Sequence, residues 1–581
     1  MRISRIRIRN FRNFSDLDVN LNQHAVIVGE NAIGKSNLVF ALRLLLDPID
    51  PTLPDAERRL RLEDFWDGLP KPLPPDAAIE ISLDLTHFED QDDLLALLAE
   101  HIVDKDPITS RLTYRFQPIE HLDGEPKTEA DYDFLIYGGD RQENLLPSDL
   151  RQRIPLVVLP ALRDAESDLE RWRRSPLRPL LEAVSGEIGA EELDALAADV
   201  EKATAALSEQ SEIRALVEDI SSRLEEMAGA AQGLDLILGF SPTKADRLIR
   251  ALRLFIDGGA RAVADASLGS ANLLYLALKT LELQRLVEEG QRSYTLLAIE
   301  EPEAHLHPHL QRLIYRDFLR ARTEPDPEDG DDRSRFAILT THSPHVASVA
   351  PLRSLVVLKK STDGSSTVGV STAELNLDQH EIDDLERYLD VTHGEILFAK
   401  GVLLVEGMAE VFLVPRFAQL LGHDLDQLGI SVCSVEGTNF APYVTFLGPA
   451  GLQIPFAVLT DMDPRVKGNA LGPDRVARLL ITLVGRDAAK AAYDGGSIDD
   501  LAAENGIFLN SNTLEVDIWG MNAVDAVCDA LSELAINKPM RERCDDYREN
   551  EPEDFPDQLL EDINRIGKGR FAQRLCAYLV A

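Results

Sequence analysis

A phosphate-binding loop is the feature of this 581-residue sequence that most constrains its fold. The segment GENAIGKS (29–36) has the spacing G-x-x-x-x-G-K-[ST], follows the apolar run AVIV and precedes SNLVFALRLLL, which has helical spacing. A strand, a glycine loop and a helix in this order predict a parallel α/β core. Gly29 and Gly34 let the backbone wrap around a phosphate, and the helix N-terminus presents free N–H groups to it.

The loop predicts ATP as a cofactor. Lys35 is placed to reach the β- and γ-phosphates, and Ser36 can offer its hydroxyl to Mg²⁺. The predicted nucleotide contacts on the loop and its flanks are Gly29, Glu30, Asn31, Gly34, Lys35, Ser36 and Asn37.

Two more buried strands supply the rest of a nucleotide site. TLLAIEEPEAHLHP (295–308) is an apolar strand that ends in two acids; Glu300 fits a Mg²⁺ ligand, and Glu301 fits the catalytic base that activates the attacking water. FAILTTHSP (336–344) ends in His342, which can contact the γ-phosphate. Ser267 and Gly269 precede a predicted helix N-terminus, a second anion site.

This order of motifs resembles ABC-type ATPases of the RecF and SMC group over roughly residues 1–390. The resemblance implies that two heads sandwich ATP, with Ser267 and Gly269 on the γ-phosphate of the partner's nucleotide. Glu300 stands where that group usually has Asp, and the signature segment lacks the common double glycine. Slow or regulatory hydrolysis is therefore expected.

A second set of acids follows apolar strands further along the chain. AVLTDMDP (457–464) carries Asp461 and Asp463, and VLLVEGMAE (402–410) carries Glu406 and Glu410. Side-by-side carboxylates repel each other unless a cation lies between them. Oxygen ligands without His or Cys suit Mg²⁺ or Mn²⁺. NSNTLEVDIWG (510–520) adds Glu515 and Asp517, again spaced by one, for a second metal.

Glu406–Gly407 followed by Asp461-x-Asp463 resembles the Toprim fold. Joined to the ATPase motifs, and with GKGRFAQ near the end of the chain, the pattern resembles the OLD (overcoming lysogenisation defect) nucleases, which include the nuclease subunit of the Gabija phage-defence system. The resemblance implies metal ligands at Glu406, Glu410, Asp461, Asp463, Glu515 and Asp517, with Lys568 as the catalytic cation. It also implies DNA as substrate, a homodimer or homotetramer, and in some members a helicase-like partner.

The predicted fold class is α/β: an ABC-type ATPase head with an inserted helical hairpin, followed by a C-terminal Toprim domain. The predicted boundaries are 1–170 and 236–393 for the two parts of the head, 171–235 for the insertion and 394–581 for the Toprim domain. The insertion is placed by apolar residues at steps of three and four, which indicate two amphipathic helices. These helices either pack on their own domain or pair with a second subunit.

The net charge limits how the chain can bind DNA, and the cysteine content indicates the compartment in which it works. The formal net charge is −40, so DNA has to be held by local arginines, such as those of MRISRIRIRNFR, and by bound metals. Those arginines have an ordinary alternative as solvated surface charges. Four scattered cysteines and no apolar run of membrane-spanning length predict a cytoplasmic protein.

Three other functions compete with a nuclease. An ATP-driven DNA clamp or repair scaffold with a non-cleaving Toprim domain is the main alternative. A topoisomerase would need a nucleophilic tyrosine, and Tyr443, Tyr493, Tyr547 and Tyr578 stand in no context typical of one. A primase is disfavoured because the sequence has no zinc-binding module.

Overall fold

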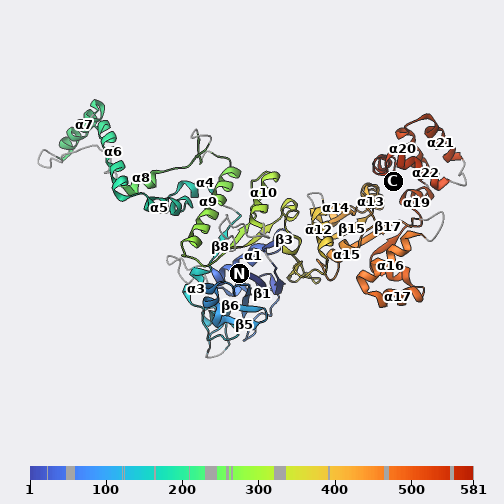
Figure 1. Cartoon of the computed structure of the whole chain (residues 1–581), viewed down its shortest axis with the longest axis horizontal. Coiled ribbons are helices and arrows are strands. Elements are labelled where there is room, and N and C mark those ends of the chain that lie inside the picture. Colours follow the sequence, from blue (N-terminus) through green and yellow to red (C-terminus); the bar gives the residue numbers. More distant parts are fainter. Residues whose placement is uncertain are drawn as a thin grey trace. The chain divides into compact units, whose positions relative to one another are not determined.

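The computed structural model of the chain describes residues 1–22, 24–47, 59–120, 122, 125–161, 165–208, 210–228, 245–256, 261–263, 266–319, 335–389, 393–463, 470–521, 523–549 and 555–579. It is a mixed α/β structure whose elements are drawn in Figure 1. Its contacts form two compact units. One comprises Met1–Leu159, Leu296–Glu303 and Pro308–Ala581, and the other comprises Pro160–Thr295 and Ala304–His307. Within the described ranges, no helix is long and apolar enough to cross a bilayer.

An antiparallel sheet begins the first unit, with strand order β2-β1-β4-β6-β5 and β7 on β6. Its strands are β1 (Arg2–Phe11), β2 (Phe14–Asn20), β4 (Ile79–Thr86), β5 (Ile102–Lys105), β6 (Ile108–Pro118) and β7 (Tyr132–Gly138). In the sequence, the helix α2 (Asp92–Leu98) follows β4, and the helix α3 (Ser148–Arg153) follows β7. The alternation in β1 buries Ile6 and Ile8, as the sequence predicts. The alternation of apolar and polar residues in IEISLDLT predicts that β4 is half-buried, and this prediction is wrong because Ser82 and Asp84 on its polar face are buried as well.

Ion pairs explain why the polar face of β4 is covered. Asp84 accepts two hydrogen bonds from Arg111, at 2.7 and 3.0 Å, and lies 3.5 Å from Arg7. Asp18 is paired with Arg5 and lies 3.7 Å from Arg7. The arginines of β1 therefore lie in a cross-strand ladder of opposite charges rather than on a purely cationic face.

The second sheet of this unit has the order β14-β13-β3-β12-β11-β8. Its strands are β3 (Ala25–Gly29), β8 (Leu156–Leu159), β11 (Thr295–Glu300), β12 (Arg335–Thr341), β13 (Leu355–Lys360) and β14 (Thr367–Ser371), and its helices are α1 (Lys35–Leu46), α10 (Pro308–Leu319), α11 (Pro344–Ala347) and α12 (Gln379–Tyr388). β3 pairs in parallel with β12 and β13. Parallel strands end at one edge of a sheet, so the predicted ATPase motifs share that edge.

A fully parallel sheet of order β16-β15-β17-β18 forms the C-terminal Toprim domain. Its strands are β15 (Gly401–Val405), β16 (Ile430–Ser434), β17 (Phe456–Thr460) and β18 (Ile507–Leu509). Its helices are α13 (Met408–Leu420), α14 (Leu425–Leu428), α15 (Ala441–Leu447), α16 (Leu471–Val484), α17 (Arg486–Asp494), α18 (Ile498–Glu504), α19 (Leu514–Gly520), α20 (Val524–Leu534), α21 (Lys538–Glu549), α22 (Phe555–Ile566) and α23 (Lys568–Tyr578). A buried cluster that includes Trp519, Tyr547 and Phe571 joins α13 to the last helices.

The second unit is mainly helical. It contains α4 (Ala165–Glu170), α5 (Leu177–Glu187), α6 (Ala190–Ser208), α7 (Ser211–Ala228), α8 (Ala245–Ala251), α9 (Leu268–Glu288) and the short strands β9 (Phe255–Ile256) and β10 (Arg261–Ala262). The two amphipathic helices predicted in the insertion are present as α6 and α7. The finer domain boundaries proposed from the sequence stay predictions.

Candidate functional site

The phosphate-binding loop lies between β3 and α1, as its spacing predicts. Gly34 has a φ of 109°, a conformation that glycine adopts without strain. Lys35 is buried, and its ammonium donates to the carbonyl oxygens of Gly29 at 2.8 Å and Glu30 at 3.0 Å. Burial lowers the pKa of Lys35 to about 8, against the opposing effect of nearby carboxylates.

The carboxyl ends of three strands meet at this lysine. Nδ1 of His342, after β12, is 3.0 Å from Lys35 Nζ, and Nε2 of His342 is 2.7 Å from the carboxylate of Glu301, after β11. Glu300 is the last residue of β11. The structure thus brings together Lys35, Glu301 and His342, three residues singled out from separate motifs.

Glu303 is a residue of this site that the sequence reasoning missed. One of its oxygens accepts hydrogen bonds from Thr341 Oγ1 at 2.9 Å and from the His342 backbone N–H at 3.0 Å. The other accepts from the Tyr315 hydroxyl at 2.9 Å. Glu303 therefore fixes the segment that carries His342. The sequence offered one hint of this residue: Glu303 is the third acid of IEEPEAH, and the predicted roles use only the first two.

The remaining predicted nucleotide contacts differ in their surroundings. Asn37 donates to Asn13 at 2.6 Å and accepts from Arg12 at 2.8 Å. These hydrogen bonds hold the start of α1 against the segment that follows β1. Asn13 also donates to the Ile33 carbonyl at 2.8 Å. Exposed positions on the loop are Glu30, Asn31 and Ser36.

Ser267 and Gly269 open α9 in the second unit. The Ser267 hydroxyl caps this helix by accepting from the Ser270 N–H at 3.3 Å. A Cβ on Gly269 would lie 2.5 Å from the His305 carbonyl oxygen, so only glycine permits this approach. The predicted helix N-terminus is therefore present, while its contact with a partner's nucleotide stays a prediction.

The acids of the Toprim sheet form two groups. In the first, Glu406 follows β15 and accepts hydrogen bonds from Thr460 Oγ1 at 2.5 Å and from the Asp461 N–H at 2.9 Å. Arg475 of α16 donates to Glu406 at 2.5 Å and to Asp463 at 2.6 Å. The sequence reasoning missed Arg475, which sits in an ordinary amphipathic helix with no motif around it.

The second group contains Glu410, Asp461, Glu515 and Lys568. The Lys568 ammonium lies 3.2 Å from Glu515, whose side chain is fully buried. Burial raises the pKa of Glu410 to about 7 and that of Asp461 to about 6. Neighbouring carboxylates add to both shifts: Asp461 and Glu515 act on Glu410, and Glu406 and Glu515 act on Asp461. Burial opposes the charge of Lys568, but Glu515, Asp461 and Glu410 together raise the pKa of its ammonium.

These residues supply the carboxylate oxygens that a divalent cation prefers as ligands. Glu515 Oε1 is buried, and its cationic neighbour is the Lys568 ammonium at 3.2 Å, while burial and neighbouring carboxylates raise the pKa values of Glu410 and Asp461. Among the residues that the structure describes, no group of three or more His, Cys, Asp or Glu side chains is arranged so that it could hold a metal ion. Arg475 holds two of the carboxylates and Lys568 holds a third.

Asp517 has hydrogen-bond partners of its own, and its predicted role beside Glu515 as a ligand of a second metal stays a prediction. Both residues lie on α19, where a spacing of two directs side chains to different faces. Asp517 instead accepts hydrogen bonds from the backbone N–H groups of Ser511 at 2.8 Å and Asn512 at 3.2 Å.

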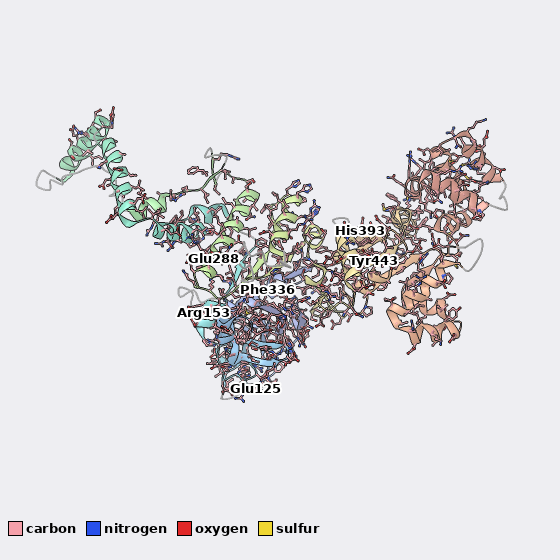
Figure 2. All side chains as sticks on the ribbon, in the orientation of Figure 1. Glu125, Arg153, Glu288, Phe336, His393 and Tyr443 are labelled. Atoms are coloured by element: carbon pink, nitrogen blue, oxygen red, sulfur yellow. The ribbon has the colours of Figure 1, made fainter. Side chains whose placement is uncertain are left out.

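Three tyrosines of the topoisomerase alternative, Tyr443, Tyr547 and Tyr578, have pKa values shifted away from activation. Tyr443 lies 4.6 Å from the ring of Tyr388, which stacks on His393, and burial raises the pKa of Tyr443 to about 12 (Figure 2). Burial also raises the pKa of Tyr547, and the Tyr578 hydroxyl donates to Glu533 at 2.6 Å. A nucleophilic tyrosine needs the opposite shift.

Two family models match the chain. The model described as "AAA domain, putative AbiEii toxin, Type IV TA system" matches residues 25–348, more than half of the chain. The model described as "Overcoming lysogenization defect protein-like, TOPRIM domain" matches residues 397–463. The first spans the predicted ATPase motifs, and the second spans Glu406, Glu410, Asp461 and Asp463.

Two relatives resemble the chain over most of its length, and a solved structure resembles its C-terminal part. The "OLD nuclease" of Thermus scotoductus is 26% identical over 79% of this chain and 82% of its own length. The "Endonuclease GajA" of Bacillus cereus is 23% identical over 84% of this chain and 80% of its own. The solved C-terminal region of the Burkholderia pseudomallei OLD protein is 43% identical, with a TM-score of 0.30, and covers 32% of this chain and 90% of that one.

Proposed function

Because this chain belongs to the OLD family, with an AAA-type ATPase region followed by an OLD-like Toprim domain, we propose that it is an ATP-regulated, divalent-metal-dependent DNA endonuclease or nickase. The observation that carries this proposal is the convergence of Glu410, Asp461 and Glu515 with Lys568 at the carboxyl edge of the Toprim sheet. Buried carboxylates with raised pKa values beside a half-exposed lysine are more typical of a catalytic site than of a domain that only binds DNA.

Glu406, Glu410, Asp461, Asp463 and Glu515 would hold Mg²⁺ or Mn²⁺, as one ion or two. Such an ion, when bound, supplies an activated water and neutralises charge on the phosphodiester. The protein's part is to orient these carboxylates: Asp461 accepts from Asn510 at 2.8 Å and from the Leu514 N–H at 3.1 Å. Lys568 remains protonated beside Glu515 and can stabilise negative charge on the phosphate.

The ATPase region is proposed to regulate this cleavage. Support comes from the contact of Lys35 with His342 and of His342 with Glu301. Bound phosphates would take over the lysine from the carbonyl groups of the loop. Glu301 is proposed to be the base for ATP hydrolysis, with Ser36 and Glu300 on its Mg²⁺.

A plasmid assay tests the proposal. Supercoiled DNA is incubated with the full-length protein, Mg²⁺ or Mn²⁺, and with or without ATP. Nicked or linear DNA should form and should vanish with Asp461→Ala or Lys568→Ala, while Lys35→Ala reports how ATP controls the rate. Intact DNA in every condition would favour the ATP-driven clamp or scaffold instead, and a covalent protein–DNA adduct would revive the topoisomerase.

The similarity to GajA also supports a role in phage defence, with DNA repair as the second setting. Cells carrying the gene should resist phage infection in a plaque assay, and Asp461→Ala should remove the resistance. Homodimers or homotetramers formed through the heads and the α6–α7 hairpin, together with a helicase-like partner, complete the proposed assembly.

A further inference from the structure

Arg475 is a buried cation that the proposed chemistry leaves without a role. Its side chain is 9% exposed, and its contacts are with acids and acceptors of the first acidic group. One guanidinium nitrogen donates to Glu406, to Thr460 Oγ1 and, at 3.2 Å, to the Asp461 carbonyl oxygen, and the other donates to Asp463. Arg475 thus bridges the two strand ends that carry Glu406 and Asp463.

The backbone fixes Arg475 in this place. The N–H of Gly472, in the first turn of α16, donates to the Met462 carbonyl oxygen at 3.0 Å. A Cβ on Gly472 would lie 2.7 Å from the Asp461 carbonyl oxygen, so the helix is in direct contact with the D-x-D segment. Arg475 is one turn further along α16 and returns to the same segment.

Each group of acids therefore has its own protein cation. Arg475 neutralises Glu406 and Asp463, and Lys568 neutralises Glu515. Unlike Lys568, Arg475 contacts both acids of its group through a rigid fork, which matches two carboxylates at once. A metal ion that bound Glu406 and Asp463 would compete with the guanidinium for the same oxygen atoms.

We propose that Arg475 is a positioning residue that takes the place of a divalent cation: it holds Glu406 and Asp463 together in the metal-free protein and gives up part of its contacts when metal binds. This inference rests on the proposed metal-dependent nuclease. It implies that Arg475 stabilises the metal-free state more than the metal-bound state, so the residue weakens metal affinity while keeping the site assembled.

The test compares full-length wild type, Arg475→Met and Arg475→Lys in chelator and in Mn²⁺, by thermal unfolding and by calorimetric titration with Mn²⁺ alone. Arg475→Met should unfold at a lower temperature without metal, because two buried carboxylates lose their counter-charge. Its Mn²⁺-induced stabilisation should exceed that of wild type, with Mn²⁺ binding about tenfold tighter, a typical size for coupling between two binding events. Arg475→Lys keeps one point charge, so its unfolding temperature and its Mn²⁺ affinity should lie between those of wild type and Arg475→Met.

Arg478→Met is the matched control, because Arg478 lies one turn from Arg475 on the exposed face of α16. It should leave both the unfolding temperature and the Mn²⁺ affinity near those of wild type.

If the Arg475 variants lose equal stability with and without Mn²⁺, or bind Mn²⁺ more weakly, Arg475 only stabilises the fold and the inference is overturned. If wild type itself does not bind Mn²⁺, the proposed nuclease site fails as well. Arg475→Lys keeps the comparison available where Arg475→Met does not fold.

Discussion

At the scale of single residues, we expect the protonation of Lys35 to control the affinity for ATP. Its pKa is lowered to about 8 by burial, so the ammonium is charged at neutral pH and loses its proton above pH 8. Phosphate groups favour the charged form, so ATP binding above pH 8 must take up a proton. ATP affinity should therefore fall about twofold between pH 7 and pH 8 and approach a fall of about tenfold per pH unit above pH 9. Fluorescent-nucleotide titrations measure this, with Lys35→Met as a control whose weak affinity is independent of pH. Unchanged wild-type affinity up to pH 9.5 would contradict it.

Glu303 should govern the rate of ATP hydrolysis rather than ATP binding. It fixes Thr341 and His342 and does not touch the phosphate-binding loop in any hydrogen bond described. Glu303→Ala should lower the kcat of hydrolysis by about 10- to 100-fold, a typical effect of releasing an outer partner of a site residue, with little change in KM. Glu303→Gln keeps an acceptor oxygen and should recover much of the loss. Steady-state ATPase kinetics decide the matter, and a rise in KM alone would argue against this role.

Motif spacing found the strand-end residues of both sites but not the residues that support them. Lys35, Glu301, His342, Glu406 and Asp461 each follow a buried strand, and parallel strands bring their ends together. Arg475 and Glu303 act through pairings that depend on tertiary contacts with Asp463 and Tyr315, and local sequence does not encode such contacts. Only a structure shows them.

At the scale of elements, the contact of α16 with the D-x-D segment should be intolerant of added volume. Gly472→Ala would place a methyl group 2.7 Å from the Asp461 carbonyl oxygen and 2.9 Å from Met462 Cα, both backbone atoms that cannot move alone. Overpacking of this kind costs about 1–3 kcal/mol of stability. We expect a folded protein with a lower denaturation midpoint and at least tenfold less DNA cleavage. Gly520→Ala, where a Cβ meets nothing within 4 Å, is the control and should change neither.

Elements were predictable where one periodicity was sustained. The helices α6 and α7, the helix α1 and the hairpin of β13 and β14 follow from apolar spacing or turn residues. α19 was missed because its seven residues are too few to separate helical from extended spacing. The polar face of β4 was expected in solvent because alternation does not reveal that Arg111 covers Asp84.

At the scale of the whole molecule, the α6–α7 hairpin should hold a second copy of the chain. Leu216 and Ile220 on α7 are 47% and 43% exposed, and Leu196 and Val200 on α6 are 52% and 38% exposed. Apolar side chains gathered on exposed helices mark association surfaces. Leu216→Glu with Ile220→Glu should shift sedimentation toward smaller species without unfolding the protein. The control exchanges exposed charges, Arg214→Glu with Glu218→Lys. Unaltered sedimentation of the double glutamate variant would place the interface elsewhere.

Because the molecule is strongly acidic, its affinity for DNA should depend on the salt concentration and on bound metal ions. With 100 acidic and 60 basic residues, the protein repels a polyanion except where arginines or metals gather, and the β1 arginines are already paired with Asp18 and Asp84. Metal ions at the Toprim acids would reverse the local sign of charge. Affinity for a short duplex should therefore fall at least tenfold between about 50 and 200 mM salt and disappear with chelator. Fluorescence anisotropy under cleavage-blocking conditions, with Ca²⁺ in place of Mg²⁺, measures both effects. Tight binding that ignored salt and chelator would require an extended cationic surface, and the paired arginines of β1 do not provide one.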